Sequence, residues 1–183
     1  MPRLNPVDPV NAQGKAKGLL DNVARALGFA PNLMKTLAVS PAALDAYLGF
    51  GHALENASLN AKVRERIAIA VSGANHCEYC AAAHTAIGRS LGLDDDELAR
   101  NLDGSSSDPT VEAALRFALA IVEKRGWVSD EDVQRVRAAG FGDREIAEVV
   151  ATVAHTAFSN YFNHVAGTEV DFPAVEMGGR AAA

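Results

Sequence analysis

Two cysteines and a histidine are spaced so that they could do chemistry together. Cys77 and Cys80 are the only cysteines of the chain, and His84 follows four residues after the second one. On a helix these three positions share one face. Two Cα atoms three residues apart on a helix lie roughly 5–5.5 Å from each other, inside the window of about 4.4–6.8 Å that a disulfide bond requires. A redox disulfide, a metal site and plain core packing are all compatible with this spacing.

The start of the expected helix would also activate the thiols. Asn75 is the expected N-cap, and Glu78 could complete a capping box with it. Cys77 and Cys80 would then lie in the first turns, near unpaired N–H groups at the positive end of the helix dipole. Such surroundings lower the pKa of a thiol from about 8.5 towards neutrality.

A histidine and a glutamate could form a proton relay. His84, one turn beyond Cys80, could accept the Cys80 proton or return a proton to a leaving group. Glu65, twelve residues before Cys77, is expected on the preceding helix, whose antiparallel packing would bring the carboxylate beside the imidazole. Outside this pattern, Glu65 would be interpreted as a surface residue of the charged triplet 64–66.

Other interpretations of the same residues stay open. The two cysteines with His84 and Glu65 could bind zinc or iron, although structural zinc usually recruits a second Cys/His pair and no further cysteine exists. Tyr79 could be a pocket wall, a hydrogen-bond donor or a core residue. Four further polar residues are expected mainly to cap and pack a helix, and alternatively they could line a site: His155, Asn160, Asn163 and His164.

Apolar residues recur at helical spacing along almost the whole chain, and alternating strand-like runs are absent. The expected helices cover about 13–27, 32–39, 41–54, 60–72, 76–91, 109–125, 129–139 and 143–166, with a shorter one starting in the acidic run 94–97. The apolar run Ile67–Val71 is expected to be deeply buried. We therefore predict an all-α fold, a helical bundle in one domain over 1–183, with a core of about 20–173 and extended ends.

A weak internal repeat accompanies the helices. Glu65 precedes Cys77 by twelve positions, and Cys77 precedes Cys80 by three. In the second half, Glu148, Asn160 and Asn163 have the same spacing. The bundle could therefore come from a duplicated helix pair, of which only one copy carries thiols; chance is an equal alternative, since Glu and Asn are common.

Composition and charge disfavour several classes of partner. The chain has 183 residues and a formal net charge of −6, which argues against nucleic acid and anionic membranes. No apolar run approaches the roughly 18–20 residues that span a bilayer, and the first residues, MPRLNPVDPVN, lack the apolar segment of a secretory signal. We expect a cytoplasmic protein, where a lone cysteine pair is more often redox-active or metal-binding than structural.

Taken together, the pattern Glu65-x11-Cys77-x2-Cys80-x3-His84 resembles the signature of the alkylhydroperoxidase D-like members of the carboxymuconolactone decarboxylase family. Upstream, APNLMKTLAVSPAALDAYLGF resembles the leading helices of the peroxidase-related branch, and downstream FSNYFNHVAGTEVDFP resembles its closing helix and tail. The resemblance covers about residues 20–173. In some members a histidine stands where this chain has Tyr79.

The resemblance implies a peroxidase of the antioxidant type that needs no cofactor or metal. By position, Cys80 would be the peroxidatic thiol and Cys77 the resolving one, while His84 and Glu65 would relay protons. The implied partners are a hydroperoxide, a dithiol or redox protein as reductant, and further copies of the chain in a homo-oligomer, a trimer or hexamer. Alternatives are a thiol–disulfide reductase or redox sensor, a metal-binding or small-ligand module, and a cofactor-free decarboxylase. The family's decarboxylase branch lacks the cysteine pair.

Overall fold

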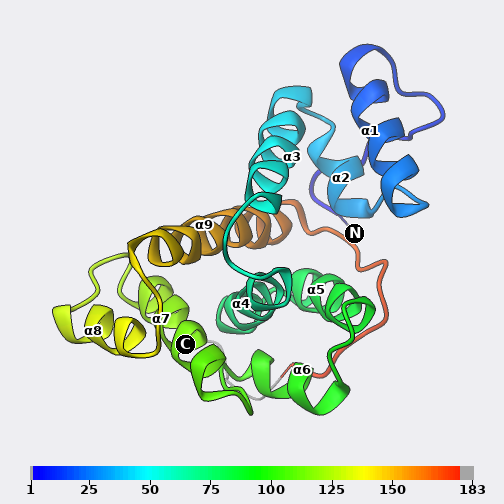
Figure 1. Ribbon diagram of the computed structural model, residues 1–183. Helices are drawn as coiled ribbons and strands as arrows, with labels where there is room; N and C mark the ends of the chain where they lie inside the picture. The colour runs from blue at the N-terminus through cyan, green and yellow to red at the C-terminus, as the bar shows by residue number, and fades with distance from the viewer. Residues whose placement is uncertain (1, 178–183) are drawn as a thin grey trace.

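The computed structural model describes residues 2–177, and within that range it contains helices and no strand (Figure 1). The helices are α1 (Gly14–Leu27), α2 (Asn32–Leu37), α3 (Pro41–Glu55), α4 (Ala61–Ala74), α5 (Glu78–Ser90), α6 (Asp95–Leu102), α7 (Pro109–Glu123), α8 (Asp130–Ala138) and α9 (Asp143–Ala166). The predicted all-α fold is confirmed, and each expected helix is present with ends within a few residues. The expected extended tail falls partly on residues 178–183, outside the described residues; residues 168–177 carry no helix.

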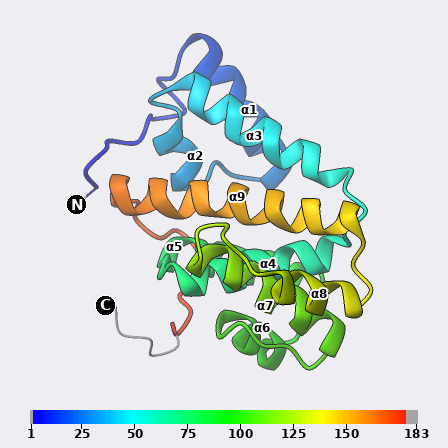
Figure 2. The same cartoon turned by 90° about the vertical axis from the view of Figure 1, so that its left-hand side faces the viewer.

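The longest helix, α9, runs between two groups of helices. The group α1, α2 and α3 lies on one side of it, and the group α4 to α8 lies on the other (Figure 2). No helix among the described residues is both long enough and apolar enough to cross a membrane. Because α9 contacts both α4 and α5 as well as α2 and α3, polar residues on its inner face can reach the start of α5.

Helix α4 is the centre of the larger group, because it packs against α5, α6, α7 and α9. Its run Ile67–Val71 is fully enclosed, as the sequence predicts, and only Ala68 in it retains a few per cent of exposure. A helix that is apolar on all sides must be covered on all sides. Neighbouring helices supply that cover with buried side chains, among them Leu115, Phe117, Val149 and Val153.

Capping residues fix where several of these helices begin. Ser40 caps α3, with Pro41 at the first helical position, and Ser129 forms a capping box with Asp132 at the start of α8. In each case the side chain and the N–H that it accepts are three positions apart, so the start of the helix is specified locally.

The helix boundaries do not follow the weak internal repeat. Between Glu65 and Cys77 the chain leaves α4, turns and enters α5, whereas Glu148 and Asn160 both lie on the unbroken helix α9. The two stretches therefore have different layouts, and a duplicated helix pair stays a prediction without support from these boundaries.

Candidate redox site

The turn between α4 and α5 places both cysteines at the start of α5. The backbone N–H of Cys77 donates to Ser72 O (2.9 Å), and His76 takes a left-handed conformation with φ of 52°. The N-cap of α5 is Cys77, whose sulfur accepts the backbone N–H of Cys80 at 3.4 Å. The prediction of Asn75 as N-cap was wrong, because Asn75 ends α4 and donates through Nδ2 to Asn160 Oδ1 (2.9 Å).

The two thiols are in direct contact and covered by protein. Their sulfurs lie 2.6 Å apart, the Cys77 thiol donating to Cys80 Sγ, and each residue is only 1% exposed. The Cys77 hydrogen bond lowers the pKa of the Cys80 thiol; burial opposes this, while the charge of His84 adds to it. The same hydrogen bond between the two sulfurs, together with burial, raises the pKa of Cys77. Cys80 is therefore the sulfur that ionises first.

Helix α9 presents polar side chains to the sulfurs. Asn163 Nδ2 donates to Cys80 Sγ at 3.1 Å and lies 3.9 Å from Cys77 Sγ, while Ser159 Oγ lies 3.9 Å from Cys80 Sγ. Asn160 Nδ2 donates to Ser72 Oγ (3.3 Å), and Asn160 also lowers the pKa of Cys80. An amide that donates to a sulfur stabilises its thiolate form. The expectation that these asparagines mainly cap and pack a helix was therefore wrong for Asn163.

Glu65 and His84 meet as a pair across α4 and α5. Glu65 Oε1 lies 2.5 Å from His84 Nδ1, and both side chains are largely buried. Burial alone would lower the pKa of His84, but the Glu65 carboxylate outweighs it and raises the pKa. With Nδ1 engaged by Glu65, the other ring nitrogen, Nε2, remains available to hold or accept a proton.

His84 acts on the thiols through its charge, since no hydrogen bond joins it to Cys80 within residues 2–177. A proton passing between His84 and Cys80 needs a bridging water or a shift of the imidazole ring. Water bridges of this kind are common where polar groups face each other beyond hydrogen-bond distance.

Tyr79 turns its hydroxyl away from the sulfurs. The hydroxyl accepts the backbone N–H of Leu33 at the start of α2 (3.0 Å), and the ring meets Phe172 edge-on with centroids 5.7 Å apart. Burial raises the pKa of this hydroxyl. Tyr79 also lines a hollow beside Cys77, so the structure places it both in the α2 contact and in the wall of a pocket.

Two aromatic side chains near the thiols, Tyr47 and His155, receive little or no weight from the sequence alone. Tyr47 on α3 is hydrogen-bonded to Ser159, and burial raises the pKa of its hydroxyl. Its ring stacks on His155, with centroids 4.4 Å apart. In the sequence Tyr47 is simply one apolar position of a helix, and nothing in its spacing connects it to the cysteines. His164, in contrast, lies at the surface with Nε2 3.3 Å from His76 O.

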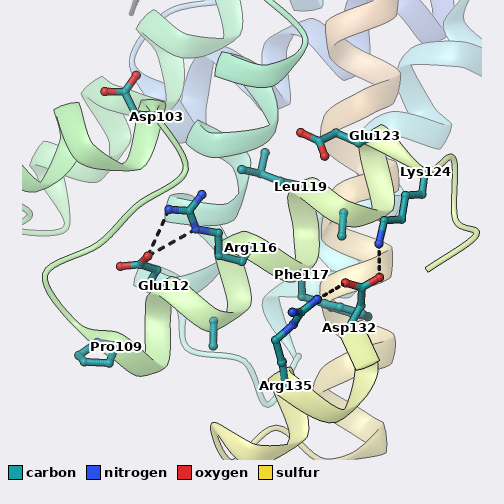
Figure 3. A pocket seen from close by; sticks show the side chains of 12 residues that line it. Asp103, Pro109, Glu112, Arg116, Phe117, Leu119, Glu123, Lys124, Asp132 and Arg135 are labelled. Carbon is teal, nitrogen blue, oxygen red and sulfur yellow. Dashed lines mark hydrogen bonds and ion pairs between the residues drawn. The ribbon is translucent and has the colours of Figure 1, made fainter. Parts of the chain in front are cut away.

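The hollow beside Cys77 has a volume of about 220 Å³ and is bounded by the turn before α5 and the end of α9. A larger hollow of about 620 Å³ lies far from the thiols, along α7 and α8 (Figure 3). Its cations are already engaged: Arg116 pairs with Glu112, and Lys124 and Arg135 both bind Asp132. The smaller hollow is therefore the one connected to the candidate chemistry.

The described residues offer no ready metal site. Within residues 2–177, no group of three or more His, Cys, Asp and Glu side chains is arranged to hold a metal ion. The two thiols are hydrogen-bonded to each other and to Asn163, and Glu65 is hydrogen-bonded to His84. The four candidate residues therefore form two separate pairs.

Comparisons with known proteins concern the family and the fold. Residues 41–124 match the carboxymuconolactone decarboxylase family. A peroxidase-related protein with the alkylhydroperoxidase AhpD core, from Ralstonia eutropha JMP134, superposes with a TM-score of 0.85 and 26% identity, over 93% of this chain and 92% of that one. The chain is similar to alkylhydroperoxidase D-like members of this family, in the matched segment and in the overall fold. The sequence resemblance is thereby confirmed.

Further structures share the fold of this chain. A peroxidase-related protein from Silicibacter sp. TM1040 has a TM-score of 0.80 and 24% identity, over 97% of this chain and 93% of that one. The debrominase Bmp8 has a TM-score of 0.78 and 18% identity, over 92% of each chain. No curated protein matches the chain in sequence. At these identities the second and third likenesses concern the fold.

Proposed function

We propose that this protein is a thiol-dependent peroxidase that reduces hydroperoxides through a reversible disulfide bond between Cys77 and Cys80. The observation that carries the proposal is the direct contact of the two sulfurs, 2.6 Å apart, beside an amide donor, Asn163 Nδ2, that lies nearer to Cys80 Sγ (3.1 Å) than to Cys77 Sγ (3.9 Å). Cys80 receives hydrogen bonds from Cys77 and Asn163 that lower its pKa, whereas the pKa of Cys77 is raised. One thiol is thus prepared as the nucleophile and the other as the proton-bearing partner that resolves the intermediate.

The proposed cycle moves two electrons. The Cys80 thiolate attacks one oxygen of the hydroperoxide, the O–O bond breaks, the alcohol leaves with a proton, and Cys80 becomes a sulfenic acid. The Cys77 sulfur then displaces the sulfenic oxygen as water, and the disulfide forms. An external dithiol or redox protein donates two electrons and two protons to restore both thiols.

The pair Glu65 and His84 would manage the protons of this cycle. Glu65 fixes the imidazole by its bond to Nδ1 and raises the pKa of His84. The protonated ring is then an acid that can deliver a proton to the leaving alkoxide, and the neutral ring is a base for Cys80. Since no direct bond to Cys80 is present within residues 2–177, we assign this transfer to a bridging water.

We further propose that the protein is cytoplasmic and acts as a homo-oligomer, a trimer or hexamer. The outer face of α9 supports self-association, because from residue 149 to 166 this helix has no Asp, Glu, Lys or Arg. Its exposed large hydrophobic side chains are Val150, Phe158, Tyr161 and Val165, and the polar His164 is exposed among them. Interfaces between protein copies are rich in aromatic residues and poor in charge at their centres.

The test is peroxide consumption with a dithiol donor. Cys80→Ser should abolish turnover, and Cys77→Ser should allow one oxidation of Cys80 without recycling. The mass of the wild-type protein should fall by two hydrogens after mild peroxide treatment, with no added oxygen. Undiminished turnover by Cys80→Ser would show that another group reacts with the peroxide.

A second candidate, a thiol–disulfide reductase or redox sensor, is favoured by the burial of both sulfurs, since a covered thiol meets peroxide slowly. It predicts the same disulfide, but peroxide would oxidise the pair no faster than it oxidises a simple dithiol. Stoichiometric zinc or iron in protein purified without added metal would support a metal-binding module instead. A decarboxylase-type activity would have to survive loss of both cysteines.

A further inference from the structure

The hollow beside Cys77 differs from the surroundings of Cys80. Cys77 and Asn163 line it, whereas Cys80 does not. Cys80 instead faces Ser159 on α9 and feels the charge of His84. Of the two sulfur-bearing residues, only Cys77 therefore borders this hollow.

Two residues that line this hollow each carry a buried oxygen with no hydrogen-bond partner among the described residues: Asn163 Oδ1 and Thr168 Oγ1. Asn163 is only 5% exposed, and its amide nitrogen is already committed to Cys80 Sγ. Buried polar atoms in native proteins are nearly always satisfied, so two such atoms on residues that line one hollow indicate a missing donor.

The wall that carries these oxygens is held in place by the end of α9. Gly167 takes a left-handed conformation with φ of 62°, and its N–H donates to Asn163 O at 2.9 Å. Thr168 N also donates to Asn163 O, at 3.3 Å. This helix-ending turn brings Thr168 back beside Asn163. Across the hollow, His164 Nε2 is bonded to His76 O, which ties α9 to the turn before α5.

We propose that this hollow is the reductant site, where a thiol that carries a neighbouring amide N–H binds to Asn163 and Thr168 and attacks Cys77 Sγ. The inference rests on the proposed redox function and adds which sulfur is attacked, from which side, and by what class of thiol. At about 220 Å³ the hollow is smaller than the roughly 300–1,000 Å³ of pockets for whole drug-sized ligands. It therefore takes only the thiol-bearing end of the reductant.

The chemistry of exchange agrees with attack at Cys77. A reductant thiolate forms a bond to Cys77 Sγ, the disulfide bond breaks, and Cys80 leaves as a thiolate. A second thiol of the reductant then attacks the reductant's own sulfur, and Cys77 leaves and takes up a proton, so two electrons and two protons are transferred in total. Exchange is faster when the leaving thiol has a low pKa. Once Cys77 is in a mixed disulfide it has no thiol proton to donate, so Asn163 Nδ2, 3.1 Å from Cys80 Sγ, is the donor in place to stabilise the departing sulfur.

The experiment compares two monothiols that differ in one group. N-acetylcysteamine has an amide N–H two carbons from its thiol, and 2-mercaptoethyl acetate has an ester oxygen there. Protein oxidised with diamide is mixed with each thiol and quenched with acid. Tandem mass spectrometry then locates the mixed disulfide on Cys77 or Cys80. The rate at which each thiol forms this adduct is divided by the rate at which the same thiol reacts with a small disulfide in solution. Diamide prepares the disulfide without any peroxidase reaction.

The expected adduct is on Cys77, forming about three to ten times faster with the amide thiol than with the ester, the value of one hydrogen bond. Thr168→Val should cut this preference at least twofold, while Thr110→Val, an exposed threonine on α7, should leave it unchanged. An adduct on Cys80, or equal normalised rates for the two thiols, would overturn the inference while leaving the redox disulfide intact. Failure of diamide to form any disulfide would contradict both proposals.

Discussion

Replacing Glu65 with glutamine tests whether a carboxylate tunes His84. The amide oxygen of Gln can still accept the hydrogen bond that Nδ1 makes over 2.5 Å, so the substitution removes the charge and keeps the shape. The His84 and Glu65 side chains are 17% and 15% exposed, so solvent screens the pair only weakly. A hydrogen bond to a charged group contributes about 1.5–3 kcal/mol. A hydrogen bond between neutral groups contributes about 0.5–1.5 kcal/mol, so Glu65→Gln should cost about 1–1.5 kcal/mol where His84 is protonated. The pKa of His84 should fall, because the carboxylate that raises it is gone.

The same change has a defined pH signature in stability. The folded pKa of His84 is raised above its ordinary value of 6.5. The stability that this shift contributes is fully present below pH 6.5 and is lost as the pH rises through the folded pKa. Glu65→Gln should therefore lower the free energy of unfolding most at about pH 5.5–6.5, and the difference from wild type should shrink towards alkaline pH.

Two assays report on this prediction. Titration of the histidine Cε1–H resonances by NMR gives the pKa of His84 directly, with its signal assigned by loss in His84→Gln. The pH dependence of kcat/KM for peroxide gives the kinetic counterpart, in which the limb assigned to His84 should move to lower pH by the same amount. Glu55→Gln is the matched control, because Glu55 pairs with His52 in a fully exposed site (3.0 Å) and screening makes such pairs weak.

A pKa of His84 that stays the same in Glu65→Gln would refute the electrostatic account. The hydrogen bond would then orient the imidazole without tuning it. A shift in the NMR titration with an unchanged kinetic profile would instead remove His84 from the proton transfer and leave the pair as a structural contact.

Three further predictions concern the thiol pair, the acid limit and helix packing. Asn163→Leu removes the donor to Cys80 Sγ and should raise the pKa of Cys80, about 6 in the native protein, by about one to two units in an iodoacetamide alkylation profile. Burial would raise the pKa of Glu97, but hydrogen bonds from the following loop outweigh it and lower the pKa to about 2. Glu97→Gln should therefore destabilise the protein by about 1–3 kcal/mol above pH 4.5, measured by urea unfolding. This difference should be lost as the pH falls through about 2. Gly73→Ala would place a methyl group against the carbonyl oxygen at the end of α6, and it should lower the free energy of unfolding by about 1–3 kcal/mol in thermal unfolding. Gly49 has open space around it, so the control Gly49→Ala should not destabilise the protein.

The helices could be predicted from the sequence because their signals are local. Apolar spacing, the Ser40-Pro41 start and the Ser129 capping box depend on residues within a few positions of one another. The start of α5 could not be predicted correctly because it depends on a residue far away in the sequence. Asparagine is a far better N-cap than cysteine on intrinsic preference, but Asn75 is held by Asn160, 85 positions away, and Cys77 takes the cap instead.

The chemical residues divide in the same way. The spacing of Glu65 and His84 predicts their meeting, because two consecutive antiparallel helices bring positions on either side of the turn together. The contact between Asn163 and the thiols depends on how α9 is rotated against α5, and no local pattern specifies that rotation. The hydroxyl of Tyr79 likewise turns to Leu33 on α2 because of tertiary packing.

Asn163 connects the two halves of the proposed cycle in one side chain. Its Nδ2 supports a negative charge on Cys80, both when that sulfur attacks a peroxide and when it leaves during reduction. Asn163 also lines the hollow beside Cys77, and its buried Oδ1 has no partner within residues 2–177. Because an amide donates through nitrogen and accepts through oxygen, filling the hollow with a donor would polarise the amide and strengthen the bond to Cys80. A bound reductant would thus improve its own leaving group, so Asn163→Leu should slow reduction by an amide thiol more than reduction by the matched ester.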